Sequence, residues 1–253
     1  MEKTLLIAGK ELPDGESFAS GAITSGRKTI ITTNHTDNSS PAPNGATKIA
    51  WNRPSALSAR SVVLKTLNEN SYLDECVIFF DEKFYAEKYA NTEGIAENVR
   101  VIEELISSYQ YMTMETITRV TKKHKSDFSN SESTEKHKLR VIFMQKTGQS
   151  VSECIIAKST SRPSPPFVST ASAAFRTYAE NIAALHIDDD DIDFLLVQCD
   201  PANELYANDK ELATWLFSYI ETLEALKRPL TQKQRLTWIK AGTKNPGGFG
   251  FFG

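Results

Sequence analysis

The sequence of 253 residues predicts one α/β domain, a doubly wound parallel sheet of six or seven strands with helices on both faces. Two observations predict this fold. Short apolar or β-branched runs alternate along the chain with segments of helical periodicity. The run CVIFF at 76–80 is apolar throughout, which is typical of a parallel strand covered on both faces.

The first half of the chain carries four of the predicted strands. A stretch rich in Ser, Asn, Pro and Gly at 35–47 predicts a loop between the second and third strands. Ser55 predicts a helix N-cap, because its hydroxyl can accept hydrogen bonds from free backbone N–H groups of the first turn. The predicted elements are strands at 3–8, 28–33, 48–51 and 76–80 and helices at 16–25 and 55–70.

The second half predicts three further helices and three further strands. A charged, Ser-rich stretch at 122–138 and a Ser/Pro-rich stretch that reaches Phe167 predict loops. The Gly/Phe-rich tail at 246–253 is expected to dock on the body of the protein or on a neighbouring subunit, since phenylalanines favour docking. Residues 1–253 are thus one domain with a tail. The predicted helices are 93–121, 169–185 and 210–226, and the strands are 139–144, 192–198 and about 236–240.

Composition excludes several classes of function. The net charge of −3 and a pI of about 5.9 argue against broad binding to nucleic acid or to an anionic membrane. The four histidines show no metal-ligand spacing, and Cys76 and Cys199 lie in apolar runs that predict buried, reduced thiols. The apolar part of the N-terminus is too short for a signal peptide, and no run of about 18 apolar residues predicts a membrane span. We therefore expect a cytoplasmic protein.

The segment 8–34 carries the most specific pattern. Gly9, Gly15 and Gly26 match three glycines in the first strand–helix–strand unit of the short-chain dehydrogenase/reductase (SDR) family, two in its TGxxxGxG turn and one before its second strand. Pro13 stands in place of the middle glycine of the turn. Further matches follow in the family's order, so the resemblance spans nearly the whole chain and implies a Rossmann-type fold. The further matches are Asn52 after the third strand, Leu73–Asp74 before the fourth, Pro201 after the sixth and 239–242 near the end.

The resemblance also implies a catalytic set. Family members use a tyrosine with a lysine four residues later on the same helix face, because the cation lowers the pKa of the phenol. The positions that match the tyrosine and the lysine hold Val168 and Ser172, and no YxxxK occurs in the chain. The family's serine falls on Gln145 or Lys146, and its asparagine on Leu105. We therefore expect these positions to be remnants, with no catalytic residue among them.

No other residue of the sequence is expected to take over the role of the family's catalytic tyrosine or lysine. Lys146 ends a predicted strand, where a lysine is usually solvated. Tyr178 lies on the predicted helix 169–185 but has Ile182 at the lysine spacing, so we expect a half-buried packing residue. The connection after Pro201 has only about eight residues, which predicts that the family's substrate lid is missing.

The cofactor turn departs from the family as well. Pro13 removes a backbone N–H and adds bulk where a pyrophosphate would approach, and Glu11, Asp14 and Glu16 place carboxylates beside it. We therefore expect that no cofactor is bound, with NAD(P) as the alternative. The residues that we expect to be remnants of the cofactor site are Gly9, Pro13, Gly15 and Asn52.

These expectations lead to two functions. The first is a non-catalytic SDR-like module for binding, assembly or regulation, and the alternative is an NAD(P)-dependent oxidoreductase with an atypical active site. The resemblance implies a homo-oligomer, a dimer or tetramer formed through helices 93–121 and 169–185, and a protein partner is also compatible with the first function. Aromatic and Met side chains are enriched at interfaces, and packing against the sheet is their alternative role. The interface candidates are Tyr109, Tyr111, Met112 and Met114.

Overall fold

The computed structural model describes residues 2–34, 42–70, 72–92, 94–130, 138–149, 164–226 and 231–244. Its strands form one parallel seven-stranded sheet in the order β3-β2-β1-β4-β5-β6-β7, so the predicted fold class is confirmed. The chain reverses its winding direction between β1 and β4. The strands are β1 (Lys3–Leu12), β2 (Arg27–Asn34), β3 (Ala46–Trp51), β4 (Glu75–Asp81), β5 (Leu139–Lys146), β6 (Ile192–Cys199) and β7 (Ile239–Lys240).

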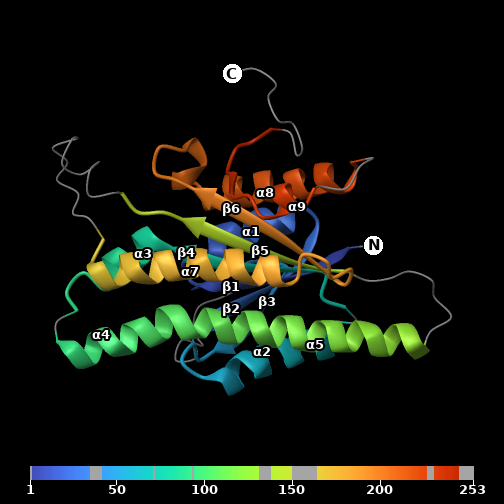
Figure 1. Ribbon diagram of the computed structural model, residues 1–253, viewed down its shortest axis with the longest axis horizontal. Helices are drawn as coiled ribbons and strands as arrows, with labels where there is room; N and C mark the ends of the chain where they lie inside the picture. The colour runs from blue at the N-terminus through green and yellow to red at the C-terminus, as the bar shows by residue number, and fades with distance from the viewer. Residues whose placement is uncertain are drawn as a thin grey trace.

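Helices cover both faces of the sheet. Figure 1 shows α8 (Asp209–Glu224) on one side of the strands and α5 (Ser108–Asn130) with α2 (Ala56–Glu69) on the other. Helix α1 (Glu16–Thr24) packs beside α8, and α7 (Pro166–Leu185) lies on the face of α2 and α5. The shorter helices are α3 (Glu82–Lys88), α4 (Ile95–Ile102), the π-helical η1 (Glu103–Ser107), the 3₁₀ turn η2 (Glu204–Ala207) and α9 (Gln232–Arg235).

Strand β4 shows why this arrangement follows from the sequence. Successive side chains of a strand point to opposite faces. Ile78 and Phe80 therefore join the core under α2, α5 and α7, while Val77 and Phe79 join the core under α1 and α8. Every residue of β4 is buried, as its continuous apolar run predicts.

Helix α5 extends further than the sequence predicts. The charged stretch 122–138 was expected to be a loop, but its first part, through Asn130, continues the helix, so that expectation is wrong there. His124 anchors this extension, since its ring is buried 5.9 Å from the ring of Tyr72. Lys123 adds a hydrogen bond from its Nζ to the Leu67 carbonyl oxygen at 3.2 Å. Residues 131–137 of that stretch, most of the loop 35–47, most of the Ser/Pro-rich loop and the tail 246–253 lie outside the described residues.

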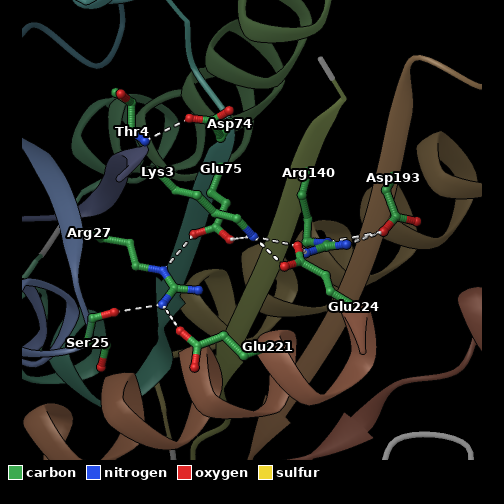
Figure 2. A network of polar contacts seen from close by, with 10 residues as sticks. All are labelled: Lys3, Thr4, Ser25, Arg27, Asp74, Glu75, Arg140, Asp193, Glu221 and Glu224. Atoms are coloured by element: carbon green, nitrogen blue, oxygen red, sulfur yellow. Dashed lines mark hydrogen bonds and ion pairs between the residues drawn. The ribbon is translucent and has the colours of Figure 1, made fainter. Parts of the chain in front are cut away.

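A network of charges lies at the amino edge of the sheet, where the strands begin (Figure 2). Arg27 and Glu75 are almost fully buried there, and Arg27 Nε lies 3.2 Å from Glu75 Oε2. Arg140 Nη2 lies 3.0 Å from Asp193 Oδ2, and its Nη1 lies 2.6 Å from Glu224 Oε1 at the end of α8. Ligands of open α/β sheets bind at the opposite, carboxyl edge. We therefore assign this network to stability.

The aspartate of the Leu73–Asp74 match has a definite role at the same edge. Asp74 Oδ2 accepts a hydrogen bond from the backbone nitrogen of Thr4 at 2.8 Å, which fixes the entry to β4 against the start of β1 (Figure 2). Cys76 and Cys199 are buried free thiols in strands, as predicted. Of the helices that the structure describes, none is both long and apolar enough to span a bilayer.

Candidate functional site

Two buried lysines meet two carboxylates at the carboxyl edge of the sheet. Lys10 comes from β1 and Lys146 ends β5, while Asp81 ends β4 and Asp209 begins α8. Lys10 Nζ lies 2.6 Å from Asp81 Oδ2 and 2.7 Å from Asp209 Oδ2. Lys146 Nζ lies 3.0 Å from Asp209 Oδ1 and 3.6 Å from Asp81 Oδ2. Each lysine thus bridges the same two carboxylates, and we call these four residues the lysine–aspartate cluster.

The charges of the cluster stabilise one another. Burial by itself lowers the pKa of Lys10, but Asp81 and Asp209 outweigh it, so that the pKa is raised above its ordinary value. Burial by itself raises the pKa of Asp81, and Lys10 and Lys146 reverse that shift, so that the pKa is lowered. The cluster therefore holds two cations and two anions in a place that shields them from water.

Ser172 connects three elements beside this cluster. Its Oγ donates a hydrogen bond to Glu82 Oε2 at 2.7 Å, and it accepts one from Gln145 Nε2 at 2.9 Å. All three side chains are buried. Ser172 is the position that we expected to match the family's lysine, and its side chain holds α3 and β5 against α7.

Arg53 forms a second buried centre, near the ends of β1 and β3. Its Nε lies 2.7 Å from Glu11 Oε1, and its Nη2 donates to the carbonyl oxygen of Gly9 at 2.8 Å. Tyr85 hydrogen-bonds to Arg53 and to the same carbonyl, and its hydroxyl lies 2.9 Å from that of Tyr109. Burial by itself lowers the pKa of Arg53, but Glu11 and the two phenols raise it well above its ordinary value. The carboxylate of Glu11 is therefore paired with a cation of the protein itself.

The two glycines of the turn are used for internal packing. Gly9 has φ of +95°, and a Cβ there would overlap the carbonyl oxygen of Phe79 and the ring of Tyr109. A Cβ at Gly15 would overlap the carbonyl oxygen of Lys10, because the turn folds back on β1 before α1 begins. Close approach of backbone to backbone accounts for both glycines.

A pocket of about 600 Å³ opens at the carboxyl edge. The described residues that line it include Lys83 and Glu87 of α3, Gly148 after β5, and Pro201 and Tyr206 after β6. Tyr206 links the pocket to the cluster, because Lys146 Nζ lies 4.7 Å from the centre of its ring. The hydroxyl of Tyr206 donates to the carbonyl oxygen of Thr147 at 2.9 Å. A concave site of this size beside paired charges suits a small ligand.

The other positions that were weighed for the family's catalytic roles lie in the core, on packing faces or in the lysine–aspartate cluster. Val168 and Leu105 are completely buried among apolar side chains under α7 and η1. Tyr178 is half-buried beside Phe143, as predicted. The expectation for Lys146 is wrong. Its ammonium group is buried and paired instead of solvated, because Asp81 and Asp209 approach it from other elements.

The other positions that we expected to be remnants of the cofactor site lie at the surface. Pro13 is exposed and follows a cis peptide bond, and Asp14 is exposed beside it. Asn52 is exposed at the end of β3, where its backbone nitrogen donates to Ser58 Oγ at 2.8 Å. The connection after Pro201 is short, as predicted, and holds the turn η2 before α8.

Sequence reasoning missed Lys10, Arg53, Asp209 and Tyr206. Lys10 and Arg53 each lie two positions after the end of a predicted strand, which is the one local signal that they lie at the carboxyl edge. Asp209 joins the cluster only through the packing of α8, and no local pattern marks such a contact. The four interface candidates differ from one another in burial. Tyr109 and Met112 are buried against the sheet, while Tyr111 and Met114 are exposed.

No protein-family model matches the sequence, and no curated protein matches it. Solved structures match its fold. A 3-ketoacyl-(acyl-carrier-protein) reductase from Brucella melitensis in complex with NADH has 12% identity and a TM-score of 0.58, over 94% of this chain and 96% of that one. A short chain dehydrogenase from Leptospira borgpetersenii with bound NAD⁺ has 12% identity and a TM-score of 0.55, over 93% and 83%. An alcohol dehydrogenase from the archaeon Thermococcus sibiricus, complexed with 5-hydroxy-NADP, has 12% identity and a TM-score of 0.55, over 94% and 95%.

These matches establish an SDR-like fold at low sequence identity. They also correct one expectation. The prediction that no cofactor is bound is contradicted, because the matching structures include complexes with NADH, with NAD⁺ and with an NADP derivative. The altered turn at Pro13 is not the whole of this edge, because the fold also brings Lys10 and Lys146 there.

Proposed function

We propose that this chain binds a nicotinamide dinucleotide at the carboxyl edge of its sheet and is an oxidoreductase with an atypical active site. The observation that carries the proposal is the pocket of about 600 Å³ beside the lysine–aspartate cluster, at the edge where open α/β sheets bind ligands. The matching structures that hold NADH, NAD⁺ or an NADP derivative support the choice of ligand.

The donor set at this edge fits a dinucleotide in part. The turn itself does not offer a bare surface, because Gly15 is packed against the carbonyl of Lys10 and Pro13 has no N–H. Lys10 and Lys146 would supply two cations, which suits a diphosphate, once a carboxylate of the lysine–aspartate cluster makes way for it. The pocket between Gly148 and Pro201 would take the nicotinamide end of the ligand. Asn52 would be free to contact the adenine end, since its side chain is exposed.

The proposed active site needs a proton donor other than the tyrosine that Val168 replaces. A bound nicotinamide supplies or accepts a hydride. Tyr206 borders the pocket, with Lys146 Nζ 4.7 Å from the centre of its ring and its hydroxyl donating to the Thr147 carbonyl oxygen. Burial raises the pKa of Tyr206, so its hydroxyl is protonated at neutral pH, although it is a weaker acid than an ordinary phenol. A protonated phenol can donate to a carbonyl oxygen, and we therefore propose that Tyr206 serves as the acid in the reduction of a carbonyl compound.

A second candidate is a non-catalytic assembly module. The observation that favours it is the apolar surface on the two helices that the family uses for oligomers. Tyr111 and Met114 on α5 and Leu185 on α7 are exposed, Leu185 by 76%. In this proposal the chain forms a dimer or tetramer through these helices and Val168 and Leu105 have only packing roles.

Binding and turnover separate the two candidates. NADH and NADPH at millimolar concentration should raise the melting temperature of the purified chain, because a ligand of the folded state stabilises it. The chain should then oxidise the bound cofactor with at least one member of a panel of aldehydes and ketones, and Tyr206→Phe should lower turnover at least tenfold without loss of binding. Binding without any turnover would favour the assembly module, and an unchanged melting temperature would refute the dinucleotide proposal. Light scattering tests the oligomer independently.

A further inference from the structure

Asp209 occupies the place between two buried ammonium groups. Its Oδ1 lies 3.0 Å from Lys146 Nζ and its Oδ2 lies 2.7 Å from Lys10 Nζ. One anion with two oxygens, each facing a different cation, resembles a phosphoryl group held by two lysines, because lysine binds phosphate as a point charge. The carboxylate therefore stands where both lysines would contact such a ligand.

The two carboxylates of the cluster are not equivalent. Asp81 ends β4 and caps α3, where its Oδ1 accepts from the backbone nitrogen of Phe84 at 3.1 Å. Asp209 has no capping role, because Asn208 caps α8 through the backbone nitrogen of Glu211. The side chain of Asp209 is also the more exposed of the two, at 13% against 5%. Asp81 is thus part of the framework, and Asp209 is the carboxylate that can be replaced.

Asp209 can leave the lysines only by turning its side chain. The backbone at the start of α8 is fixed against α1, since a Cβ at Gly21 would overlap the carbonyl oxygen of Lys210. The neighbours of Asp209 in the chain, Asn208 and Lys210, are exposed. A rotation of the Asp209 side chain therefore moves its carboxylate toward water while α8 stays in place.

We propose that Asp209 is a built-in competitor for a phosphoryl ligand: it neutralises Lys10 and Lys146 when the site is empty and turns outward when a diphosphate binds between them. The inference rests on the proposed function for the identity of the natural ligand. Its chemistry requires only a phosphoryl group, either free pyrophosphate or the diphosphate of a dinucleotide.

The test is to remove the competing carboxylate and measure anion binding. Calorimetric titration of Asp209→Asn with pyrophosphate and with NADH should give dissociation constants at least tenfold lower than those of the wild type. Asp193→Asn is the matched control, because Asp193 is a similarly buried carboxylate paired with Arg140 at the opposite edge. It should leave both constants within twofold. Adding Lys146→Met to Asp209→Asn should reverse the gain.

The outcomes are distinguishable. Tighter pyrophosphate binding by Asp209→Asn without any binding of NADH would support the competitor and refute the dinucleotide proposal. Equal NADH binding by Asp209→Asn and the wild type would support the dinucleotide and overturn the competitor. Equal gains in Asp209→Asn and Asp193→Asn would also overturn it. If Asp209→Asn does not fold, a crystal structure of the wild type with pyrophosphate decides, since the competitor requires the anion between Lys10 and Lys146 and Asp209 turned away.

Discussion

Replacement of Gly9 by alanine tests the packing at the end of β1. Gly9 has φ of +95°, and a Cβ there would overlap the carbonyl oxygen of Phe79 and the ring of Tyr109. Gly26 is a matched control in the same chain. Its φ is +76°, but among the described residues, its chain neighbours apart, no heavy atom lies within 4 Å of the place that a Cβ would take. The two substitutions share the backbone cost, and only Gly9→Ala adds overpacking.

The expected magnitudes follow from these two costs. A left-handed backbone costs an L-residue about 1–2 kcal/mol. Alanine also has less conformational freedom than glycine in the unfolded chain, which offsets about 0.4–1 kcal/mol of that cost. Gly26→Ala should therefore lower the free energy of unfolding by about 1 kcal/mol. Overpacking adds about 1–3 kcal/mol, so Gly9→Ala should lower it by about 2–4 kcal/mol.

Urea unfolding followed by circular dichroism measures both variants against the wild type. The midpoint should shift further for Gly9→Ala than for Gly26→Ala, with the same dependence on urea in all three proteins. If Gly9→Ala costs no more than Gly26→Ala, then the backbone of β1 does not approach β4 and Tyr109 as closely as described, and the explanation of the first glycine of the turn fails.

Three further predictions concern titration and buried charge. The free energy of unfolding should fall as the pH drops below about 4. The reason is that Asp81 has a lower pKa in the folded than in the unfolded chain, so its stabilisation is lost as the pH falls through the folded value. Equal stability in urea titrations near pH 7 and pH 3 would contradict this. Glu75→Gln should cost about 3 kcal/mol by leaving the buried Arg27 without its buried partner. Glu221→Gln, which removes the 60% exposed partner of Arg27, should cost less than about 1 kcal/mol, and equal costs would refute the assignment. Burial raises the pKa of the Cys76 thiol to about 12, so alkylation mapped by mass spectrometry should reach Cys76 only after unfolding.

The fold could be predicted because its signals are local. Gly9, Gly15 and Gly26 mark the first turn and the start of β2, and the apolar run at 76–80 marks a strand buried on both faces. The error at 122–130 has a physical cause. The charges there suggest a loop, but the burial of His124 holds that segment as a helix.

The candidate site was harder to predict because it depends on contacts between distant parts of the chain. Lys146 looks like a solvated lysine until Asp209, on a helix that follows another strand, is brought to it. Arg53 and Glu11 neutralise each other across 42 positions of the sequence. Without those pairings, the acidic turn is expected to repel a phosphate, Lys146 is expected to be solvated, and Lys10 is marked only by its place after a predicted strand.

Helix α8 takes part in both charge networks of the protein. Asp209 begins the helix at the carboxyl edge, while Glu221 and Glu224 end it among Arg27, Lys3 and Arg140 at the amino edge. The twelve steps from Asp209 to Glu221 span about 18 Å of helix. One inserted residue would lengthen that span by about 1.5 Å and rotate one end by about 100° relative to the other, so the two networks could no longer be satisfied together. The length of α8 is therefore fixed from both ends, and substitutions on its outer face should be tolerated far better than any insertion or deletion between Asp209 and Glu221.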